Sequence, residues 1–266
     1  MNKQDYRFDP AMPPVSNRPL YIYRVMMKWL SFFVFGLGSL LLTVVCFPVM
    51  RLCLHPRERF RLYARRLISR SLRFFTAFMG ALKIVKLEVE DRDAFKRLSS
   101  KIIVANHPSL LDVVILLSLI PNADCIVRGN LSRTILRGII RQLYIPNSLD
   151  PEELLASCAD SLKQGNNIII FPEGTRTPRN GALIFKKGAF RLALLSGRSI
   201  IPVFIGGTDK YGLGKGDPWT VFNHREKYIY RIRMGEEILP ENYSHLTKIR
   251  AVRHLTGDVQ NLFLQK

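Results

Sequence analysis

Two short stretches of this chain place polar side chains where an apolar strand should end. In the first, residues 101–105 (KIIVA) precede Asn-His-Pro-Ser and an apolar helical pattern, so His107 and Asp112 lie at the join. Because His107 precedes the helix and Asp112 falls in its first turn, the imidazole can fold back toward the carboxylate. A carboxylate there fixes the ring tautomer and leaves the second nitrogen as a general base for a hydroxyl. Alone, the pair also fits a loop histidine beside an aspartate favoured at a helix N-terminus.

The second stretch, residues 168–177 (IIIFPEGTRT), is a buried strand that continues directly into Pro-Glu-Gly-Thr-Arg. Gly174 permits a turn whose backbone N–H groups can face an anion. Arg176 offers a planar fork for a phosphate, and Lys186 adds a point charge nearby. A solvated basic loop is the alternative interpretation. The combination of a strand, a glycine turn and an arginine favours an anion site.

The elements that position these residues follow from the hydrophobic pattern beyond residue 81. Short apolar strands alternate there with amphipathic helices, a pattern typical of a mixed, largely parallel α/β sheet flanked by helices. We expect strands at residues 82–89, 101–105, 124–128, 143–146, 167–172, 200–205 and 228–234. We expect helices at residues 109–119, 131–142, 151–164, 186–196 and 244–264. The polar residues then follow strand ends, where open α/β sheets bind ligands.

The N-terminal part carries a different pattern. Residues 29–50 contain no charged side chain, and about 20 such residues in a helix cross a hydrocarbon core of about 30 Å. Eight arginines follow between residues 51 and 73, interleaved with leucine and phenylalanine. This pattern predicts an amphipathic basic helix against anionic membrane lipids. The positive charge behind the apolar run predicts a cytoplasmic (inner) membrane location with the catalytic domain facing the cytoplasm.

Two alternatives remain for the apolar run. It could be the buried helix of a soluble domain, or, given Gly36, Gly38 and Pro48, a kinked helix that enters only one leaflet. We therefore divide the chain into a flexible tail (1–20), a membrane-anchoring helical segment (21–80) and a catalytic domain (81–266).

The formal net charge of +19 indicates an anionic partner, which could be phospholipid, nucleic acid or a phosphorylated substrate. The four cysteines form no CxxC pair and no metal-like spacing with the five histidines. We expect buried thiols at Cys125 and Cys158, a reducing compartment and no metal site. Ser109 and the cysteines have no evident activating neighbour in the sequence, so a covalent nucleophile is poorly supported.

The blocks NHPSLLD and FPEGTR, with Ile201-Pro202-Val203 as a third, closely resemble the glycerolipid (lysophospholipid) acyltransferases over about residues 80 to 235. The resemblance implies transfer of a fatty acyl group from acyl-carrier protein or coenzyme A to a lysophospholipid hydroxyl, such as that of 1-acyl-glycerol-3-phosphate. His107 would be the base and Asp112 its partner, and no cofactor is implied because a thioester is already activated. The implied substrate-binding residues are Asn106, Glu173, Gly174, Thr175, Arg176 and Lys186, with Glu173 more structural than the others.

One departure from the family concerns the acceptor. Family members commonly carry an arginine after the short strand at 143–146, where this chain has Asn147. The same chemistry on a specialised acceptor, such as an amino-acid lipid or a polyene or pigment lipid, is therefore an alternative. A non-catalytic, membrane-tethered nucleic-acid-binding protein is the alternative of another class. No RRM, KH or helix-turn-helix signature supports it, so we expect no nucleic-acid partner. The oligomeric state is not indicated.

Overall fold

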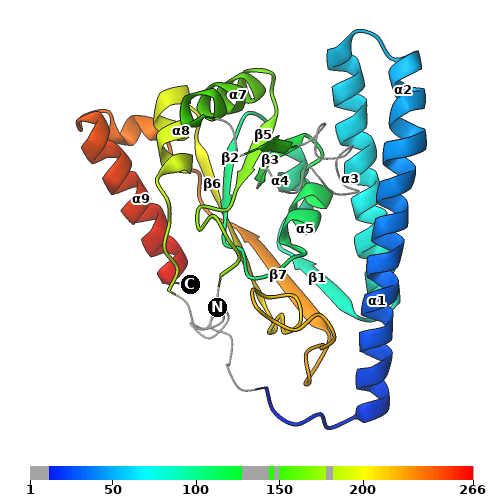
Figure 1. The fold of residues 1–266 in the computed structure, drawn as a ribbon. Helices are drawn as coiled ribbons and strands as arrows, with labels where there is room; N and C mark the ends of the chain where they lie inside the picture. Colours follow the sequence, from blue (N-terminus) through cyan, green and yellow to red (C-terminus); the bar gives the residue numbers. More distant parts are fainter. Residues whose placement is uncertain (1–11, 128–143, 147–149, 178–181, 266) are drawn as a thin grey trace.

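The structure is a computed structural model that describes residues 12–127, 144–146, 150–177 and 182–265 (Figure 1). Within these residues, the strands form one seven-stranded sheet in the order β1-β7-β6-β2-β5-β3-β4. The strands are β1 (Val85–Val89), β2 (Ile102–Ala105), β3 (Ala123–Val127), β4 (Tyr144–Pro146), β5 (Asn167–Ile170), β6 (Ile200–Gly207) and β7 (Tyr228–Met234). Neighbouring strands are parallel except for β6 and β7, which are antiparallel. The expected mixed, largely parallel sheet is confirmed.

Helices cover both faces of this sheet (Figure 1). The helical segments are α1 (Arg18–Leu41), η2 (Leu42–Cys46), α2 (Phe47–Cys53), α3 (Arg57–Ala81), α4 (Arg92–Arg97), α5 (Asp112–Leu119), α7 (Pro151–Lys163), α8 (Gly188–Ser196), η4 (Pro240–Tyr243) and α9 (Lys248–Leu264). Helices α3 and α5 lie on one side of the sheet, and α7, α8 and α9 lie on the other.

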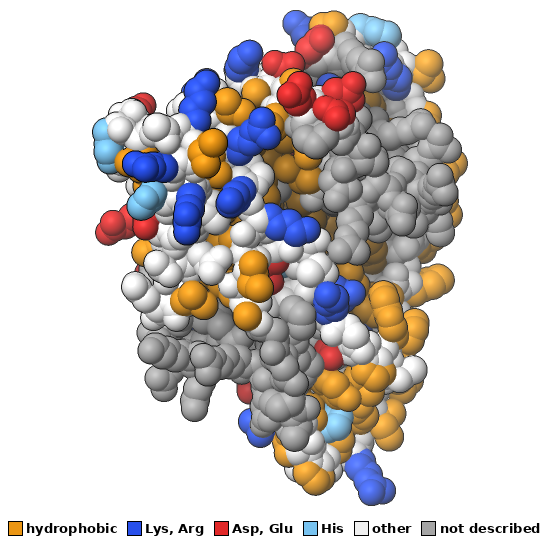
Figure 2. Space-filling model, turned by 60° about the vertical axis from the view of Figure 1, so that its left-hand side comes forward, with side chains coloured by type: hydrophobic (Ala, Val, Ile, Leu, Met, Phe, Trp, Pro, Cys, Tyr) orange, Lys and Arg blue, Asp and Glu red, His pale blue; other side chains and the backbone are white. Residues whose placement is uncertain are grey.

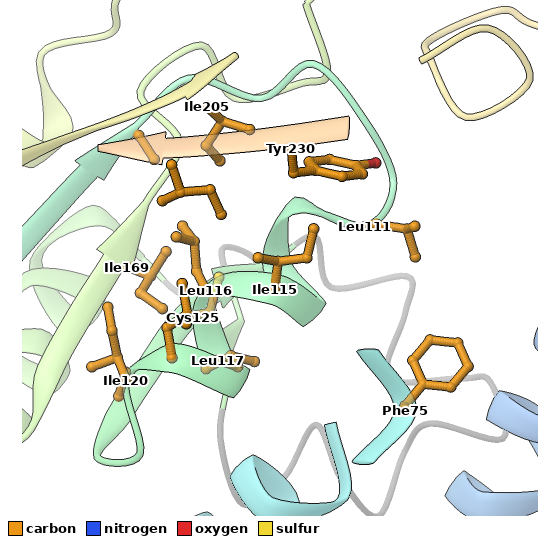
Figure 3. Packing of buried hydrophobic residues seen from close by; sticks show 14 of the residues in the cluster. Phe75, Leu111, Ile115, Leu116, Leu117, Ile120, Cys125, Ile169, Ile205 and Tyr230 are labelled. Carbon is orange, nitrogen blue, oxygen red and sulfur yellow. The ribbon is translucent and has the colours of Figure 1, made fainter. Parts of the chain in front are cut away.

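The alternation of side chains along the central strands divides the core into two layers. Successive residues of a strand point to opposite faces, and here both faces are apolar because both are covered. The odd-numbered isoleucines pack with α3 and α5, and they are Ile103, Ile169, Ile201 and Ile205. Figure 3 shows this layer around Ile169, Ile115 and Tyr230. The even-numbered isoleucines pack with α7, α8 and α9, and they are Ile102, Ile168, Ile170 and Ile200.

The N-terminal segment is a long helix, α1 to α2, with α3 running back beside it (Figure 1). The stretch Arg18–Cys53 is long and apolar enough to cross a membrane by length and composition. A π-helical turn, Leu42–Cys46, separates α1 from α2. It ends two residues before Pro48, whose missing N–H cannot bind the carbonyl one turn earlier. Helix α1 begins at Arg18, so the last three residues of the stretch expected as a tail are helical.

Helix α3 differs from the expectation in its surroundings. We expected its basic face to lie against lipid headgroups, but Arg65 is buried and forms an ion pair with Asp124 at 2.8 Å. Ala64, Ile68 and Phe75 on the same helix belong to the protein core. The headgroup prediction is therefore wrong for Arg65, because this arginine points toward the sheet.

Other element boundaries differ by a few residues. The expected helix 109–119 begins only at Asp112, and the expected helix 244–264 begins at Lys248, after a 3-10 turn. Helix α4 was not expected, and the carboxylate of Asp91 caps it by accepting from the N–H groups of Asp93 and Ala94. The expected helix 131–142 lies outside the described residues.

Candidate active site

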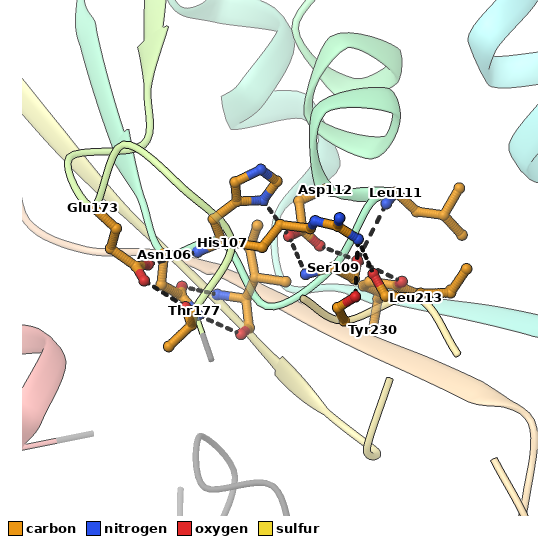
Figure 4. A network of polar contacts seen from close by, with 12 residues as sticks. Asn106, His107, Ser109, Leu111, Asp112, Glu173, Thr177, Leu213 and Tyr230 are labelled. Atoms are coloured by element: carbon orange, nitrogen blue, oxygen red, sulfur yellow. Dashed lines mark hydrogen bonds and ion pairs between the residues drawn. The ribbon is translucent and has the colours of Figure 1, made fainter. Parts of the chain in front are cut away.

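The two polar stretches meet at the carboxyl ends of three adjacent parallel strands. Strand β2 lies between β5 and β6, so the loop after β2 and the loop after β5 emerge at the same edge. The two loops are joined by hydrogen bonds from His107 N to Glu173 Oε1 at 2.9 Å and from Thr177 N to His107 O at 2.8 Å. Figure 4 shows the resulting network. The two stretches, far apart in the sequence, therefore lie side by side in the fold.

The centre of the site is the pair His107 and Asp112. His107 Nδ1 lies 2.8 Å from Asp112 Oδ2. Since an ionised carboxylate accepts only, Nδ1 carries the proton and Nε2 holds the free lone pair. The Asp112 side chain is fully buried, while the His107 side chain remains 16% exposed. Because Asp112 is buried and the His107 ring is partly exposed, the imidazole can accept a proton from a bound hydroxyl.

The Asp112 carboxylate binds the turn before helix α5 as well as the histidine. It accepts from Ser109 N at 2.6 Å and from Ser109 Oγ at 2.5 Å. These bonds fold residues 109–111 into a turn around the carboxylate, which explains why the helix begins only at Asp112. Ser109 is fully buried and donates its proton to Asp112, so it has no means of acting as the nucleophile.

The plane of the imidazole is fixed from the side of β5. The rings of His107 and Phe171 are stacked, with centroids 4.2 Å apart and an interplanar angle of 25°. Phe171 is the first residue after strand β5. With one face covered by phenyl and Nδ1 bound to Asp112, the ring has little rotational freedom.

Glu173 connects the loops. Its two carboxylate oxygens accept from His107 N and from Thr177 Oγ1, the latter at 2.6 Å. Burial raises the pKa of this carboxyl, and the hydrogen bonds from Thr177 and His107 lower it in part. Both oxygens are thus engaged in holding the site together, in line with the expected structural part of Glu173.

Gly174 forms the turn that the sequence predicted. It has φ +69°, a left-handed conformation that disfavours any side chain, and a Cβ at this position would lie 2.8 Å from Lys186 Nζ. Its N–H donates to Phe171 O at 3.0 Å, so this N–H closes the turn. The cation beside the turn is the ammonium group of Lys186.

Arg176 has a second function besides any ligand contact. Its Nη1 donates to Leu213 O and Gly214 O, both at 2.9 Å, and so holds the loop after β6. Among the described residues, the hydrogen bonds of this guanidinium come from Nη1, which leaves the Nε and Nη2 donors for an anion. Thr175 is half-buried next to it. Phosphate binding by Thr175, Arg176 and Lys186 stays a prediction.

Asn106 is bound to the neighbouring strand. Its Nδ2 donates to Ile205 O at 2.9 Å, and its Oδ1 accepts from Ile205 N at 2.8 Å. This pairing continues the β2–β6 ladder by a side chain and fixes the backbone immediately before His107. Its predicted substrate contact stays a prediction.

The cysteines behave as the sequence indicated. Cys125 and Cys158 are buried. Burial, with the nearby Asp124 charge, raises the pKa of the Cys158 thiol to about 12 and that of Cys125 further still. Neither thiol has the exposure or the low pKa that a nucleophile needs. The expected lack of a metal or cofactor stays a prediction.

Sequence reasoning missed Tyr230, whose Oη lies 2.8 Å from Ser109 Oγ across 121 residues of chain. It also missed Phe171 as the stacking partner of His107. The alternation in YIYRIRM indicates which residues of β7 are buried, but only the fold shows what they contact. Asn147, on which the acceptor question depends, lies outside the described residues.

The chain resembles known proteins in sequence and in fold. Residues 86–206 match the family model described as "Acyltransferase". The chloroplastic 1-acyl-sn-glycerol-3-phosphate acyltransferase LPAT1 of Arabidopsis thaliana is 34% identical over 113 residues, which are 40% of this chain and 32% of that protein. The human 1-acyl-sn-glycerol-3-phosphate acyltransferase beta is 28% identical over 140 residues, which are 50% of this chain and 49% of that protein. The chain thus spans between about a third and half of the length of these two relatives.

The fold has a solved counterpart. The crystal structure of PlsC from Thermotoga maritima, described as a 1-acyl-sn-glycerophosphate (LPA) acyltransferase, superimposes with a TM-score of 0.66. The match covers 88% of this chain and 95% of that chain at 23% identity. At this identity the similarity shows a shared fold.

Proposed function

We propose that this chain, whose residues 86–206 match the acyltransferase family model, transfers a fatty acyl group from a thioester to the hydroxyl of a lysophospholipid of the 1-acyl-glycerol-3-phosphate type. The observation that carries this proposal is the His107–Asp112 pair, held at 2.8 Å at the strand ends. Relatives with this printed activity and a fold shared with an enzyme of the same description support the choice of acceptor.

The proposed reaction proceeds by direct attack. His107 Nε2 takes the proton of the acceptor hydroxyl as its oxygen bonds to the thioester carbonyl carbon. The tetrahedral intermediate then expels the thiolate, which receives the same proton from the imidazolium. An ester and a free thiol result, and His107 returns to its starting state. Asp112 stabilises the imidazolium during the step.

Arg176 and Lys186 would bind the acceptor phosphate. Two donor groups of Arg176 and the ammonium group beside Gly174 supply positive charge next to the loop that carries Glu173. The donor is also anionic, since coenzyme A carries phosphates and acyl-carrier protein is an acidic class of protein. In the view of Figure 2, several Lys and Arg side chains lie close together in the upper left, and this positive charge suits either donor.

We further propose that α1 attaches the enzyme to the cytoplasmic face of the inner membrane. Helix α1 and the turn η2 that continues it carry an exposed apolar stripe at helical spacing, formed by Ile22, Met26, Phe33, Leu37, Leu40 and Val44. Its opposite side faces protein, where buried Lys28 donates to the carbonyls of Trp219 and Val221. Because α3 runs beside α2 and the adjoining part of α1 (Figure 1), these features favour a helix lying in one leaflet over an isolated span.

The test uses the full chain purified in detergent. It is incubated with acyl-coenzyme A or acyl-carrier protein, and with lysophosphatidic acid or an uncharged monoacylglycerol. We expect thiol release that requires the acceptor, and phosphatidic acid as the product by mass spectrometry. Thiol release at the same rate without acceptor would show a thioesterase and contradict the proposal. Preference for the uncharged acceptor would instead support a specialised lipid.

A further inference from the structure

Tyr230 lies at the inner end of the hydrogen-bond network that leads to His107. It is fully buried on β7, and its Oη is 2.8 Å from Ser109 Oγ. Ser109 Oγ in turn lies 2.5 Å from Asp112 Oδ1. Figure 4 shows the phenol, the serine and the aspartate in this order.

The direction of each hydrogen bond follows from the number of protons. A serine hydroxyl has one proton to donate and two lone pairs to accept with. Ser109 gives its proton to Asp112, because an ionised carboxylate only accepts. Tyr230 must therefore donate to Ser109 Oγ, which also accepts from Leu111 N at 3.2 Å. The serine hydroxyl is then fully satisfied, and a change at Tyr230 alters the group that holds Asp112.

The surroundings keep the phenol in its donating form. Burial, and then the Asp112 charge, raise the pKa of Tyr230 well above its ordinary value. The ammonium group of Lys210 lies 4.4 Å from the ring centroid and donates to Ile229 O on the same strand. A cation over the face of the ring holds the ring in place.

We propose that Tyr230 is a positioning residue of the active site: through Ser109 it holds the Asp112 carboxylate in the orientation that keeps the His107 proton on Nδ1. The inference rests on the proposed function, because it assigns Tyr230 to the base of that reaction. Tyr230 does not touch His107 in this network; it acts on the imidazole through its hydrogen bond to Ser109, which in turn binds Asp112. Glu173 is another titratable group beside the pair; it binds His107 N and is unchanged in the variants below.

The chain offers a matched control on the same strand. Tyr228 is also buried, lies two residues earlier on the same face of β7, and donates its hydroxyl to Tyr211 O at 2.7 Å. Tyr228→Phe and Tyr230→Phe each remove one buried hydroxyl with its hydrogen bond, so we expect similar losses of thermal stability. Only Tyr230→Phe alters the support of Asp112.

The experiment compares both variants in the full chain. With Tyr230→Phe we expect kcat to fall about threefold to tenfold near neutral pH, the size of one lost hydrogen bond, with the acceptor KM unchanged. The acidic limb of the kcat/KM profile should move to higher pH. The Asp112 carboxylate then accepts a weaker hydrogen bond from Ser109 and attracts the imidazolium proton more strongly. When Tyr230→Phe is added to Ser109→Ala, kcat should fall no further than in Ser109→Ala alone. The dependence of kcat/KM on pH should be the same in Tyr228→Phe as in the wild type.

A second readout is independent of catalysis. Histidine ¹⁵N NMR of the purified chain, with His107→Gln to assign its signals, reports the tautomer and titration of His107. Tyr230→Phe should shift this titration, and Tyr228→Phe should not. An unchanged titration and an unchanged rate profile in Tyr230→Phe would overturn the inference, even if acyl transfer is confirmed. A shifted titration in a chain without acyl transfer would uphold the inference and refute the proposed reaction.

Discussion

At the scale of single residues, the active site is built so that one nitrogen stays available. Asp112 accepts from His107 and twice from Ser109, Phe171 covers one face of the imidazole, and Glu173 holds the backbone N–H. Each contact fixes the imidazole or its partner and leaves Nε2 for substrate. The proposed general base is therefore oriented before any ligand arrives, and such orientation can supply much of the value of a catalytic base.

Glu173 gives a residue-scale prediction with a pH dependence. Glu173→Gln keeps an acceptor for His107 N and places an amide against the Thr177 hydroxyl, so we expect a folded, active protein. Glu173→Ala removes both contacts and should lower the free energy of unfolding by about 2–4 kcal/mol. The comparison is made by thermal unfolding in detergent.

The sign of the pH effect follows from the raised pKa of Glu173. The folded state binds this proton more tightly than the unfolded state, so the contribution of Glu173 to stability falls as pH rises above its ordinary value of 4.5. Glutamine has no proton to lose. The stability of Glu173→Gln relative to wild type should therefore rise with pH from about 4.5 through the raised pKa of the folded state. A difference that is constant with pH would contradict this account.

At this scale the sequence predicted the pair and the loop that supports it, because both lie within a few residues of a strand end. The contact between His107 and Asp112 and the turn at Gly174 follow from such local spacing, and the phosphate role of Arg176 stays a prediction. Sequence reasoning missed Tyr230, because strand β7 approaches the site only through pairing with β6. Local spacing reveals local chemistry, whereas a contact across 121 residues depends on the strand order.

At the scale of elements, α3 is joined to the sheet by a buried ion pair. Arg65 binds both carboxylate oxygens of Asp124, at 2.8 and 2.9 Å, and Ser161 also donates to this carboxylate. The sequence predicted a basic helix here, but it did not indicate which arginine faces inward. Arg65 and Arg66 are adjacent, and one position turns a side chain by about 100° around a helix. Only the packing of α3 on the core separates them.

This ion pair gives the element-scale prediction. Arg65→Met leaves Asp124 buried without its cation and should cost about 3–5 kcal/mol of stability. The matched control is Arg66→Met, which removes the same charge from an exposed position and should cost less than about 1 kcal/mol. Adding Asp124→Leu to Arg65→Met should recover part of the loss. Equal unfolding temperatures for the two single variants would show that the ion pair is unimportant.

At the scale of the whole molecule, one side of the N-terminal helices faces protein and the other is exposed and apolar. Phe33, Leu37 and Val44 are 67%, 56% and 61% exposed on this stripe. The uncharged apolar run predicted a membrane segment, but the sequence did not show which side of the helix is exposed. That side is determined by the packing of α3 and the loop after β6 against the other side.

The stripe gives the prediction at this scale. The triple variant Phe33→Gln, Leu37→Gln, Val44→Gln should weaken binding to anionic vesicles about a hundredfold or more, since each apolar side chain contributes about 1.5–3 kcal/mol when buried. The control variant Ile184→Gln, Ile249→Gln changes equally exposed isoleucines of the catalytic domain, at 67% and 84%, and should bind normally. Vesicle flotation measures both. Loss of flotation only in the control would place the membrane surface on the catalytic domain.

The central claim is that His107 acts as the base of an acyl transfer. The most direct test is the rate of phosphatidic acid formation by His107→Ala, with circular dichroism and vesicle flotation showing that the variant folds and binds membrane. We predict a fall in kcat of about a thousandfold, within the range for loss of a general base, and little change in the KM for lysophosphatidic acid. Turnover close to that of the wild type in folded His107→Ala would contradict the account.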